Sequence, residues 1–232
     1  MIPQIVLPER RFKMPNDKWL TALPYRVADE KALLSIQPND IIGSISILSD
    51  LCSRCIKEDI DVDSLHFGEL MWIYLNIYAI SVSSTINFVV GHKRKDKDGN
   101  EIDCSVPVSI KIDDIKFEEF KNELIIPVDT TEGKYNILIE QPTIADYKKL
   151  SGNMSEDELT LIYIKSMYDE SGNNVIELNH DDKVELLNML DAKRGQELVE
   201  FAKQMSRPYY DAKVKCPICG YEYSERIYDF FI

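Results

Sequence analysis

The sequence lacks the features that mark membrane-spanning and secreted proteins. Its most apolar stretch, residues 70–80, is well short of the roughly 20 residues that a membrane span needs, and Asn76 interrupts it. No basic segment leads into an apolar core at the N-terminus, so we expect no signal peptide. These two absences predict a protein that works in a cytoplasm and does not bind membranes.

Excess positive charge and catalytic signatures are missing as well. The 27 Lys and Arg residues face 40 Asp and Glu residues, giving a net charge of −13, which opposes nucleic-acid binding because that binding depends on neutralising phosphates. With 9 Gly and 3 His, the chain has no G-x-S-x-G elbow, no phosphate-binding glycine loop and no H-E-x-x-H sequence. We therefore predict that the protein is not an enzyme and has no catalytic or cofactor-binding residues.

Five cysteines are present, and this odd number without an export signal favours reduced thiols or a metal site over disulfides. Cys216-Pro-Ile-Cys219-Gly220 has the spacing of a zinc knuckle, in which two thiolates chelate one metal from a tight turn. One such pair supplies only half of a tetrahedral site. Zinc binding and a metal-free turn both remain open, and a redox pair is less favoured because no βαβ unit surrounds it.

Two further residues are candidate ligands for the same metal. His92 and Cys104 lie at comparable places on the two arms of a predicted hairpin, with its turn at Asp98-Gly99-Asn100. They could meet across the hairpin and complete a site with Cys216 and Cys219. An ordinary exposed hairpin without a ligand role is equally consistent with the lysine-rich turn.

A second Cys-x-x-Cys pair, Cys52 and Cys55, has a different context. Both residues continue an apolar stripe at helical spacing that begins at Ile41 and includes Ile45 and Leu48. Thiols on such a stripe pack as small apolar groups. We therefore predict that this pair belongs to the core rather than to a metal site.

The apolar pattern predicts an α+β fold in which N-terminal helices pack on a small antiparallel sheet. In residues 1–141, we expect helices near 28–34, from Asn39 or Asp40 to Cys55, and from Ser64 to Ser81, the last of them buried at the centre. Four β-branched segments predict the strands of one sheet, at residues 85–91, 103–112, 123–128 and 134–140.

The character changes to helix near Gln141, which we take as a domain boundary. Residues 142–232 are predicted to form a helical region with a short Cys-x-x-Cys β-knuckle and an aromatic tail at its end. One helix is expected from about Ser155 to Tyr168. Another is expected from His180 to Met205, capped by Asn179 and bent at Gly195.

Four segments, at residues 23–34, 52–65, 67–75 and 79–83, carry a resemblance in this order. Together they resemble the T-even-type bacteriophage baseplate hub assembly proteins, a family found in contractile-tailed phages. Residues 23–34, LPYRVADEKALL, look like that family's R-P-F…E-E-K-x-L-L segment. Cys52 and Cys55 followed by residues 59–65, DIDVDSL, are similar to its helix end and D-I-D-x-L loop. Residues 67–75, FGELMWIYL, and 79–83, AISVS, look like its F-D-x-E-Y-L-F-L helix and A-K-S-V-G exit.

The last twenty residues also resemble phage baseplate proteins, which end in C-P-x-C-G and a D-F-F-like terminus, here residues 229–231. The chain departs from the family in the hairpin, where relatives carry paired cysteines and this chain has only His92 and Cys104. That departure favours the metal-free interpretation of Cys216 and Cys219 and leaves a protein-binding role intact.

The resemblance implies a non-enzymatic factor in assembly of the central baseplate hub, as an assembly chaperone or a minor structural component. It implies tail hub or tape-measure proteins as partners. It also implies a location in the cytoplasm of the infected host bacterium or in the virion baseplate. An alternative is a phage-encoded adaptor or regulator that binds a host protein such as the transcription machinery.

The aromatic tail supplies the predicted protein-binding residues, since aromatic side chains often anchor interfaces. The alternative is that these side chains pack back on their own domain. The residues concerned are Tyr221, Tyr223, Tyr228, Phe230 and Phe231.

Overall fold

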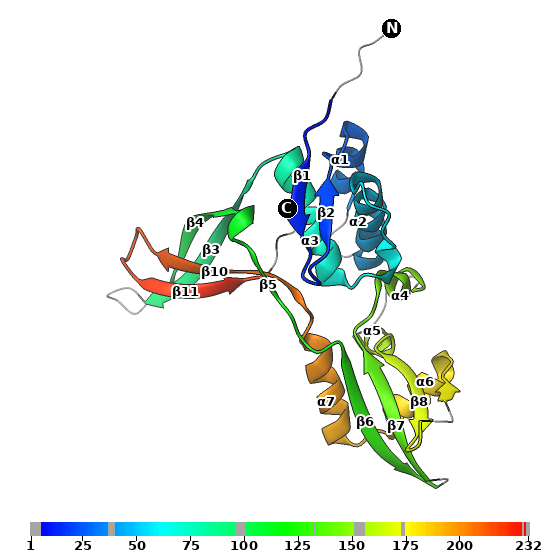
Figure 1. Ribbon diagram of the computed structural model, residues 1–232. Helices are drawn as coiled ribbons and strands as arrows, with labels where there is room; N and C mark the ends of the chain where they lie inside the picture. The colour runs from blue at the N-terminus through cyan, green and yellow to red at the C-terminus, as the bar shows by residue number, and fades with distance from the viewer. Residues whose placement is uncertain are drawn as a thin grey trace.

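A computed structural model describes residues 6–36, 40–95, 101–131, 133–150, 156–172, 175–228 and 230. Its N-terminal part, which we call the body, contains the hairpin of β1 (Arg10–Lys13) and β2 (Trp19–Ala22). Three helices follow in the body: α1 (Val27–Leu34), α2 (Ile41–Cys55) and α3 (Phe67–Ser81). Figure 1 shows these elements grouped around α3.

Helix α3 lies at the centre of the body, as the sequence predicts. It begins at a capping box between His66 and Glu69, and most of its side chains are buried. Gly68 allows the first turn to approach the chain just before β10, because a Cβ atom there would lie 1.8 Å from the carbonyl oxygen of Ser206. The same helix therefore contacts α2 on one side and the start of β10 on another.

The strands form four sheets in the described residues, not the single sheet that the sequence predicts. Strands β3 (Thr85–Lys95) and β4 (Glu101–Lys111) pair only with each other, while β6 (Glu123–Thr130) and β7 (Gly133–Glu140) join a different sheet. The reason lies between them, where the short helix η2 (Ile112–Asp114) and strand β5 (Lys116–Glu118) carry the chain away from the first hairpin. The predicted turn at Asp98–Asn100 lies outside the described residues.

The prediction of a helical region after Gln141 is also wrong, because the described residues of that region form four strands. Residues 164–168, expected in a helix, form most of β8 (Ile164–Asp169), which pairs with β7 and with β9 (Val175–Glu177). The preceding helix α5 (Glu156–Leu161) is short, and Ser155 lies outside the described residues. Ile164 is buried against Ile137 and Ile139 of the sheet, so tertiary packing decides in favour of a strand.

The predicted helix from His180 to Met205 is two helices. Helix α6 (His180–Met189) ends before Leu190, and α7 (Ala192–Lys203) begins after Asp191, whose side chain accepts a hydrogen bond from the Arg194 backbone N–H. The break therefore falls at a new N-cap rather than at Gly195. Helix α7 covers the β6–β9 sheet with Leu198 and Phe201 (Figure 1).

The predicted short knuckle is instead part of a long hairpin. Strand β10 (Arg207–Lys215) pairs with β11 (Glu222–Ile227) through six residue pairs, and its first residues pair with β5. Apolar residues alternate along β10, with Ala212 and Val214 buried and their neighbours exposed. Alternation with a period of two residues is typical of a strand. Strand β10 therefore begins well before the cysteine pair and is longer than a short knuckle requires.

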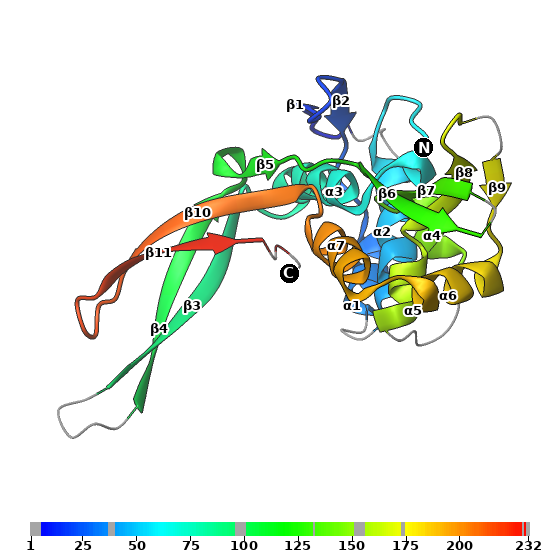
Figure 2. The ribbon, with the colours of Figure 1, turned by 90° about the horizontal axis from the view of Figure 1, so that it is seen from below.

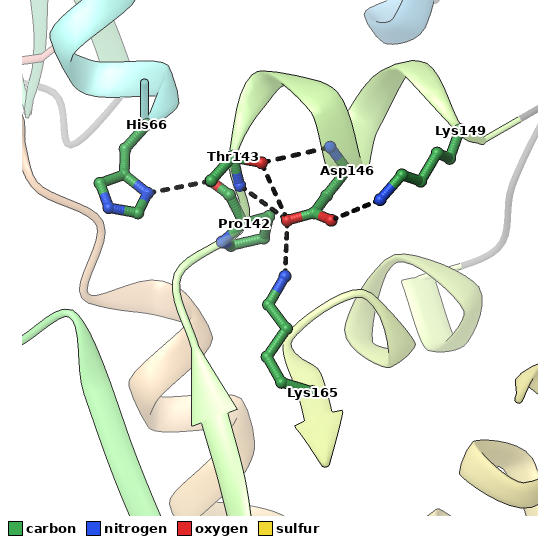
Figure 3. A network of polar contacts seen from close by, with 6 residues as sticks. All are labelled: His66, Pro142, Thr143, Asp146, Lys149 and Lys165. Carbon is green, nitrogen blue, oxygen red and sulfur yellow. Dashed lines mark hydrogen bonds and ion pairs between the residues drawn. The ribbon is translucent and has the colours of Figure 1, made fainter. Parts of the chain in front are cut away.

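The joint between the body and the β6–β9 sheet is a polar network around helix α4 (Ile144–Lys148), shown in Figure 3. His66 Nδ1 lies 3.2 Å from the carbonyl oxygen of Pro142, and the Thr143 hydroxyl caps the helix. Asp146 accepts a hydrogen bond of 2.5 Å from Lys165. Burial alone would raise the pKa of Asp146, but the bonds from Lys165 and Thr143 outweigh it and hold that pKa at about 2. The division into domains near Gln141 stays a prediction.

Candidate metal centre

Two hairpins, β3–β4 and β10–β11, extend together from the body as an arm, seen in both Figure 1 and Figure 2. Each hairpin has its own hydrogen-bonded ladder, and no ladder between the two is formed by the residues that the structure describes. Their facing sides share a small buried core, made of Val90, Cys104, Val106, Ala212, Val214 and Cys216. The arm is therefore held together by side chains.

The two hairpins place four candidate ligands at one point of this interface. His92 of β3 and Cys104 of β4 are direct partners in the antiparallel register, so their side chains lie on the same face. Cys216 directly follows β10, and Cys219 lies in the turn that leads to β11. Gly220 closes this turn with a positive φ of 71° and donates its N–H to the Cys216 carbonyl at 2.8 Å.

The ligand atoms of His92, Cys104, Cys216 and Cys219 all lie within 4.8 Å of one another. His92 Nε2 is 3.2 Å from Cys219 Sγ. In a tetrahedral zinc site, bond lengths of 2.0–2.1 Å to nitrogen and 2.3 Å to sulfur place neighbouring ligand atoms roughly 3.6–3.8 Å apart. The four side chains are thus close to the spacing that a single metal ion requires.

The surroundings of the sulfurs affect their ionisation in opposite directions. Burial, together with the neighbouring sulfur of Cys216, raises the pKa of Cys104. Burial also opposes ionisation of Cys216, but backbone N–H groups of Cys219 and Ile218 donate to its sulfur and lower the pKa of that thiol. The turn therefore stabilises a thiolate at Cys216, and the thiolate is the form that binds metals.

Aromatic rings cover one side of the cluster. The His92 ring lies 5.1 Å from the ring of Tyr223 and 5.5 Å from that of Tyr221, and the two tyrosines stack at 5.7 Å. His92 Nδ1 is buried without a hydrogen-bond partner among the described residues. The stack fixes the imidazole plane, so that Nε2 is the nitrogen directed at the sulfurs.

The remaining residues of the predicted aromatic tail lie elsewhere. The Tyr228 hydroxyl donates to Glu118 at 3.1 Å, and the Arg207 guanidinium lies 3.6 Å from the centre of the Tyr228 ring. Phe230 is buried in a cluster with Leu75 of α3, and Phe231 lies outside the described residues. Of the described tail residues, Tyr221 and Tyr223 lie beside the candidate metal centre, whereas Tyr228 and Phe230 pack on the chain's own elements.

Sequence reasoning missed Ile218, which is 61% exposed in the turn between the two cysteines. Tyr221, three residues on, is 59% exposed. The sequence signal for this exposed residue was an apolar side chain between the two cysteines. When both cysteines of such a turn point inward, the residues between them point outward.

Cys52 and Cys55 belong to the core, as predicted. Both are buried in the cluster between α2 and α3, and Cys52 Sγ lies 4.0 Å from the carbonyl oxygen of Leu70. Burial raises the pKa of both thiols, that of Cys55 to about 11. The one group of potential metal ligands found among the described residues does not include them.

The family described as T4 bacteriophage base plate protein matches residues 8–232, a range that includes every element from β1 to β11. The chain belongs to this family, which confirms the predicted relationship to T4-type baseplate proteins. Membership implies a role related to the phage baseplate, a location in the virion tail and interaction with other phage tail proteins. The family is a structural one and is generally non-enzymatic.

Comparison with curated proteins and with solved structures gives no match. Among the described residues, no helix combines the length and the apolar character needed to cross a membrane.

Proposed function

We propose that this chain is a non-enzymatic protein-binding factor in assembly of the central hub of a contractile-tail baseplate. It acts there as an assembly chaperone or as a minor structural component. Membership of the baseplate family supports a role among tail proteins. The arm supports a role in binding, because its two hairpins extend away from the body (Figure 2) and carry the exposed side chains of Ile218 and Tyr221.

The observation that carries this proposal is the exposed turn at residues 216–221. Ile218 and Tyr221 stand in solvent on a turn whose backbone is fixed by two hydrogen bonds, from Gly220 to Cys216 and from Cys216 to Tyr221. Isolated exposed apolar residues are common. A rigid aromatic and aliphatic pair at the end of a projection is, however, what an interface anchor requires, because little side-chain freedom is lost on binding.

The proposed partners are tail hub or tape-measure proteins. The net charge of −13 favours partners with basic surfaces, because complementary charge speeds association and excludes like-charged proteins. The proposed site of action is the cytoplasm of the infected host, with retention in the virion baseplate if the protein is structural. One zinc ion at the four-residue cluster is the proposed cofactor, since three thiols and an imidazole suit that ion.

Co-purification from infected cells tests the binding role. Ile218→Asp and Tyr221→Ala should reduce recovery of the hub and tape-measure proteins by at least about tenfold, because loss of an interface anchor costs roughly 2 kcal/mol or more. Val175→Asp is the matched control, since Val175 is equally exposed, at 62%, but lies on β9 outside the arm.

Two outcomes would count against the proposal. Unchanged recovery of tail proteins by both arm variants rejects the arm as the binding surface. Recovery of host polymerase or a sigma factor in place of tail proteins favours the adaptor role. Mass spectrometry of purified virions then separates a structural component, which remains in the particle, from an assembly chaperone, which does not.

A further inference from the structure

We infer that the four side chains bind one zinc ion within a single chain, and that this ion clamps hairpin β3–β4 to hairpin β10–β11 and so fixes the exposed turn of the arm. The inference rests on the zinc ion proposed above and goes beyond it, because it assigns the ion a mechanical role. The geometry behind it is that each hairpin contributes two of the four ligands.

The donor set points to zinc in a closed structural site. Three sulfurs and one imidazole nitrogen are soft and borderline ligands, which suit zinc and disfavour magnesium and calcium, both of which prefer oxygen. Four protein ligands complete a tetrahedron, so no position remains for a water or a substrate. Such a site stabilises structure and performs no hydrolysis.

The site closes within one chain. Its four ligand atoms already lie within 4.8 Å of one another on a single copy, so a second subunit has no ligand to supply. Cys104 and Cys216 are buried at 1% and 0% exposure, which keeps their sulfurs away from a neighbouring molecule. The expected stoichiometry is therefore one ion per chain.

The arm needs such a clamp because its other connections are weak. A two-stranded hairpin such as β3–β4 is marginally stable alone in water, and β10–β11 gains only the short strand β5 at its base. The two hairpins share no backbone ladder among the described residues. The buried core beside the four ligands is small, and three of its six buried members are cysteine or alanine: Cys104, Ala212 and Cys216. A few small side chains bury little apolar area, so they supply little of the free energy that holds the hairpins together.

The position of the ligands in the sequence increases the effect of a clamp. His92 and Cys219 are 127 positions apart. An ion that joins such distant residues restricts the unfolded chain more than one that joins close neighbours. On binding zinc, the cysteine thiols lose their protons to solvent.

The clamp also explains how the arm presents its contact residues. Cys216 and Cys219 flank Ile218, and Tyr221 stacks on Tyr223 beside His92. Fixing both sulfurs and the imidazole on one ion fixes the turn and the aromatic stack together. Removal of the ion would leave the exposed pair attached to a loose hairpin.

The first experiment measures metal content and its coordination. Full-length protein purified without chelator should contain one zinc ion per chain by elemental analysis. After exchange into cobalt, it should show the absorption bands of a tetrahedral thiolate site. Cys104→Ala should abolish both signals, and Cys55→Ala, a control on the core cysteine of α2, should leave them unchanged.

The second experiment measures the arm itself by hydrogen exchange of backbone amides, before and after zinc is removed with a chelator under reducing conditions. Amides of β3, β4, β10 and β11 should exchange at least about tenfold faster without zinc, because opening a clamped element exposes its hydrogen bonds. Amides of β6 and β7 in the four-stranded sheet serve as the internal control and should not change.

The outcomes separate the levels of the inference. Absence of stoichiometric metal, or disulfides among these cysteines in the protein as purified, overturns the zinc assignment and the clamp with it. One zinc per two chains overturns closure within one chain. Bound zinc with unchanged exchange in the arm overturns the clamp alone and leaves the zinc assignment standing. None of these results alters the co-purification test, so the baseplate role fails or survives independently.

Discussion

The chain contains two Cys-x-x-Cys pairs of identical spacing, and the structure treats them in opposite ways. Cys52 and Cys55 lie on helix α2, where both thiols pack between α2 and α3. Cys216 and Cys219 lie on a turn that directs both sulfurs toward His92 and Cys104. The comparison teaches that spacing alone does not make a metal site, since the backbone that carries the pair decides what each sulfur faces.

The helix and the turn differ in what they offer a thiolate. On α2, the backbone N–H groups are used within the helix, so burial dominates and raises the pKa of Cys52 and Cys55. In the turn, backbone N–H groups of Ile218 and Cys219 point at the sulfur of Cys216 and lower its pKa. A neutral thiol suits an apolar core, and a thiolate suits a metal.

The largest expected effect on stability comes from a substitution that destabilises the body and leaves the arm intact. Leu70→Ala should lower the free energy of unfolding by about 3–5 kcal/mol, because Leu70 is fully buried in the cluster that holds Cys52 and the change opens a cavity. Urea denaturation followed by tryptophan fluorescence measures the loss. Zinc content at low denaturant should remain that of the unmodified protein, and metal loss would show that the two regions depend on each other.

A smaller effect is expected when the core cysteine is made polar. Cys52→Ser should lower the free energy of unfolding by roughly 1–3 kcal/mol, because it buries a hydroxyl where an apolar thiol packed. Thermal denaturation of the variant measures this, with elemental analysis as the second readout. A variant that keeps its stability but loses its metal would reverse the roles that we assign to the two cysteine pairs.

The next prediction concerns the pH dependence of stability at the joint around Asp146. This part of the molecule is held by charge rather than by sulfur. The pKa of Asp146 is about 2 in the folded protein, below the ordinary value of 3.8. The stabilisation is therefore present above about pH 4 and is lost as the pH falls toward 2. Solvent screening of this partly exposed carboxylate limits it to about 1–2 kcal/mol. Denaturation as a function of pH should show this loss in the unmodified protein and not in Asp146→Asn. An identical acid profile in the two proteins would contradict it.

The smallest effect concerns the turn that carries the second pair. Gly220→Ala should destabilise the arm by about 1 kcal/mol, because a positive φ is unfavourable for a residue with a Cβ atom. Hydrogen exchange in β10 and β11 measures the change, which should not reach β6 or β7. Gly195→Ala on α7 is the matched control, since its surroundings leave open space for a Cβ atom and it is helical. Equal effects at the two glycines would show that the turn conformation is not what matters.

Local sequence signals predicted the helices of the body but not the pairing of the strands. Helix α3 could be read from an apolar stretch and its start near Ser64, because helical hydrogen bonds join near neighbours. The sequence predicts helix where β8 forms because part of what buries Ile164, namely Ile137 and Ile139 of β7, is distant from it in the sequence. The break before α7 was misplaced at Gly195 because the cap at Asp191 was not recognised.

The candidate site was predictable in halves. Cross-strand pairing of His92 and Cys104 follows from the hairpin register, and the proximity of Cys216 to Cys219 follows from their spacing. That the two hairpins face each other depends on β5, which pairs with β10 and brings the C-terminal strands to the first hairpin. No local pattern encodes that contact. The Cys-x-x-Cys pattern does not single out Ile218, because it specifies the two ligand positions and leaves the residues between them open.

Zinc content of two double variants tests the central claim most directly. Cys52→Ser with Cys55→Ser alters the helical pair, and Cys216→Ser with Cys219→Ser alters the turn pair, so the two proteins differ from the parent by the same chemistry. Elemental analysis of each, purified without chelator in the folded state, should give one zinc ion per chain for the first and none for the second. Equal zinc content in the two variants, or zinc lost only from the first, would contradict the account.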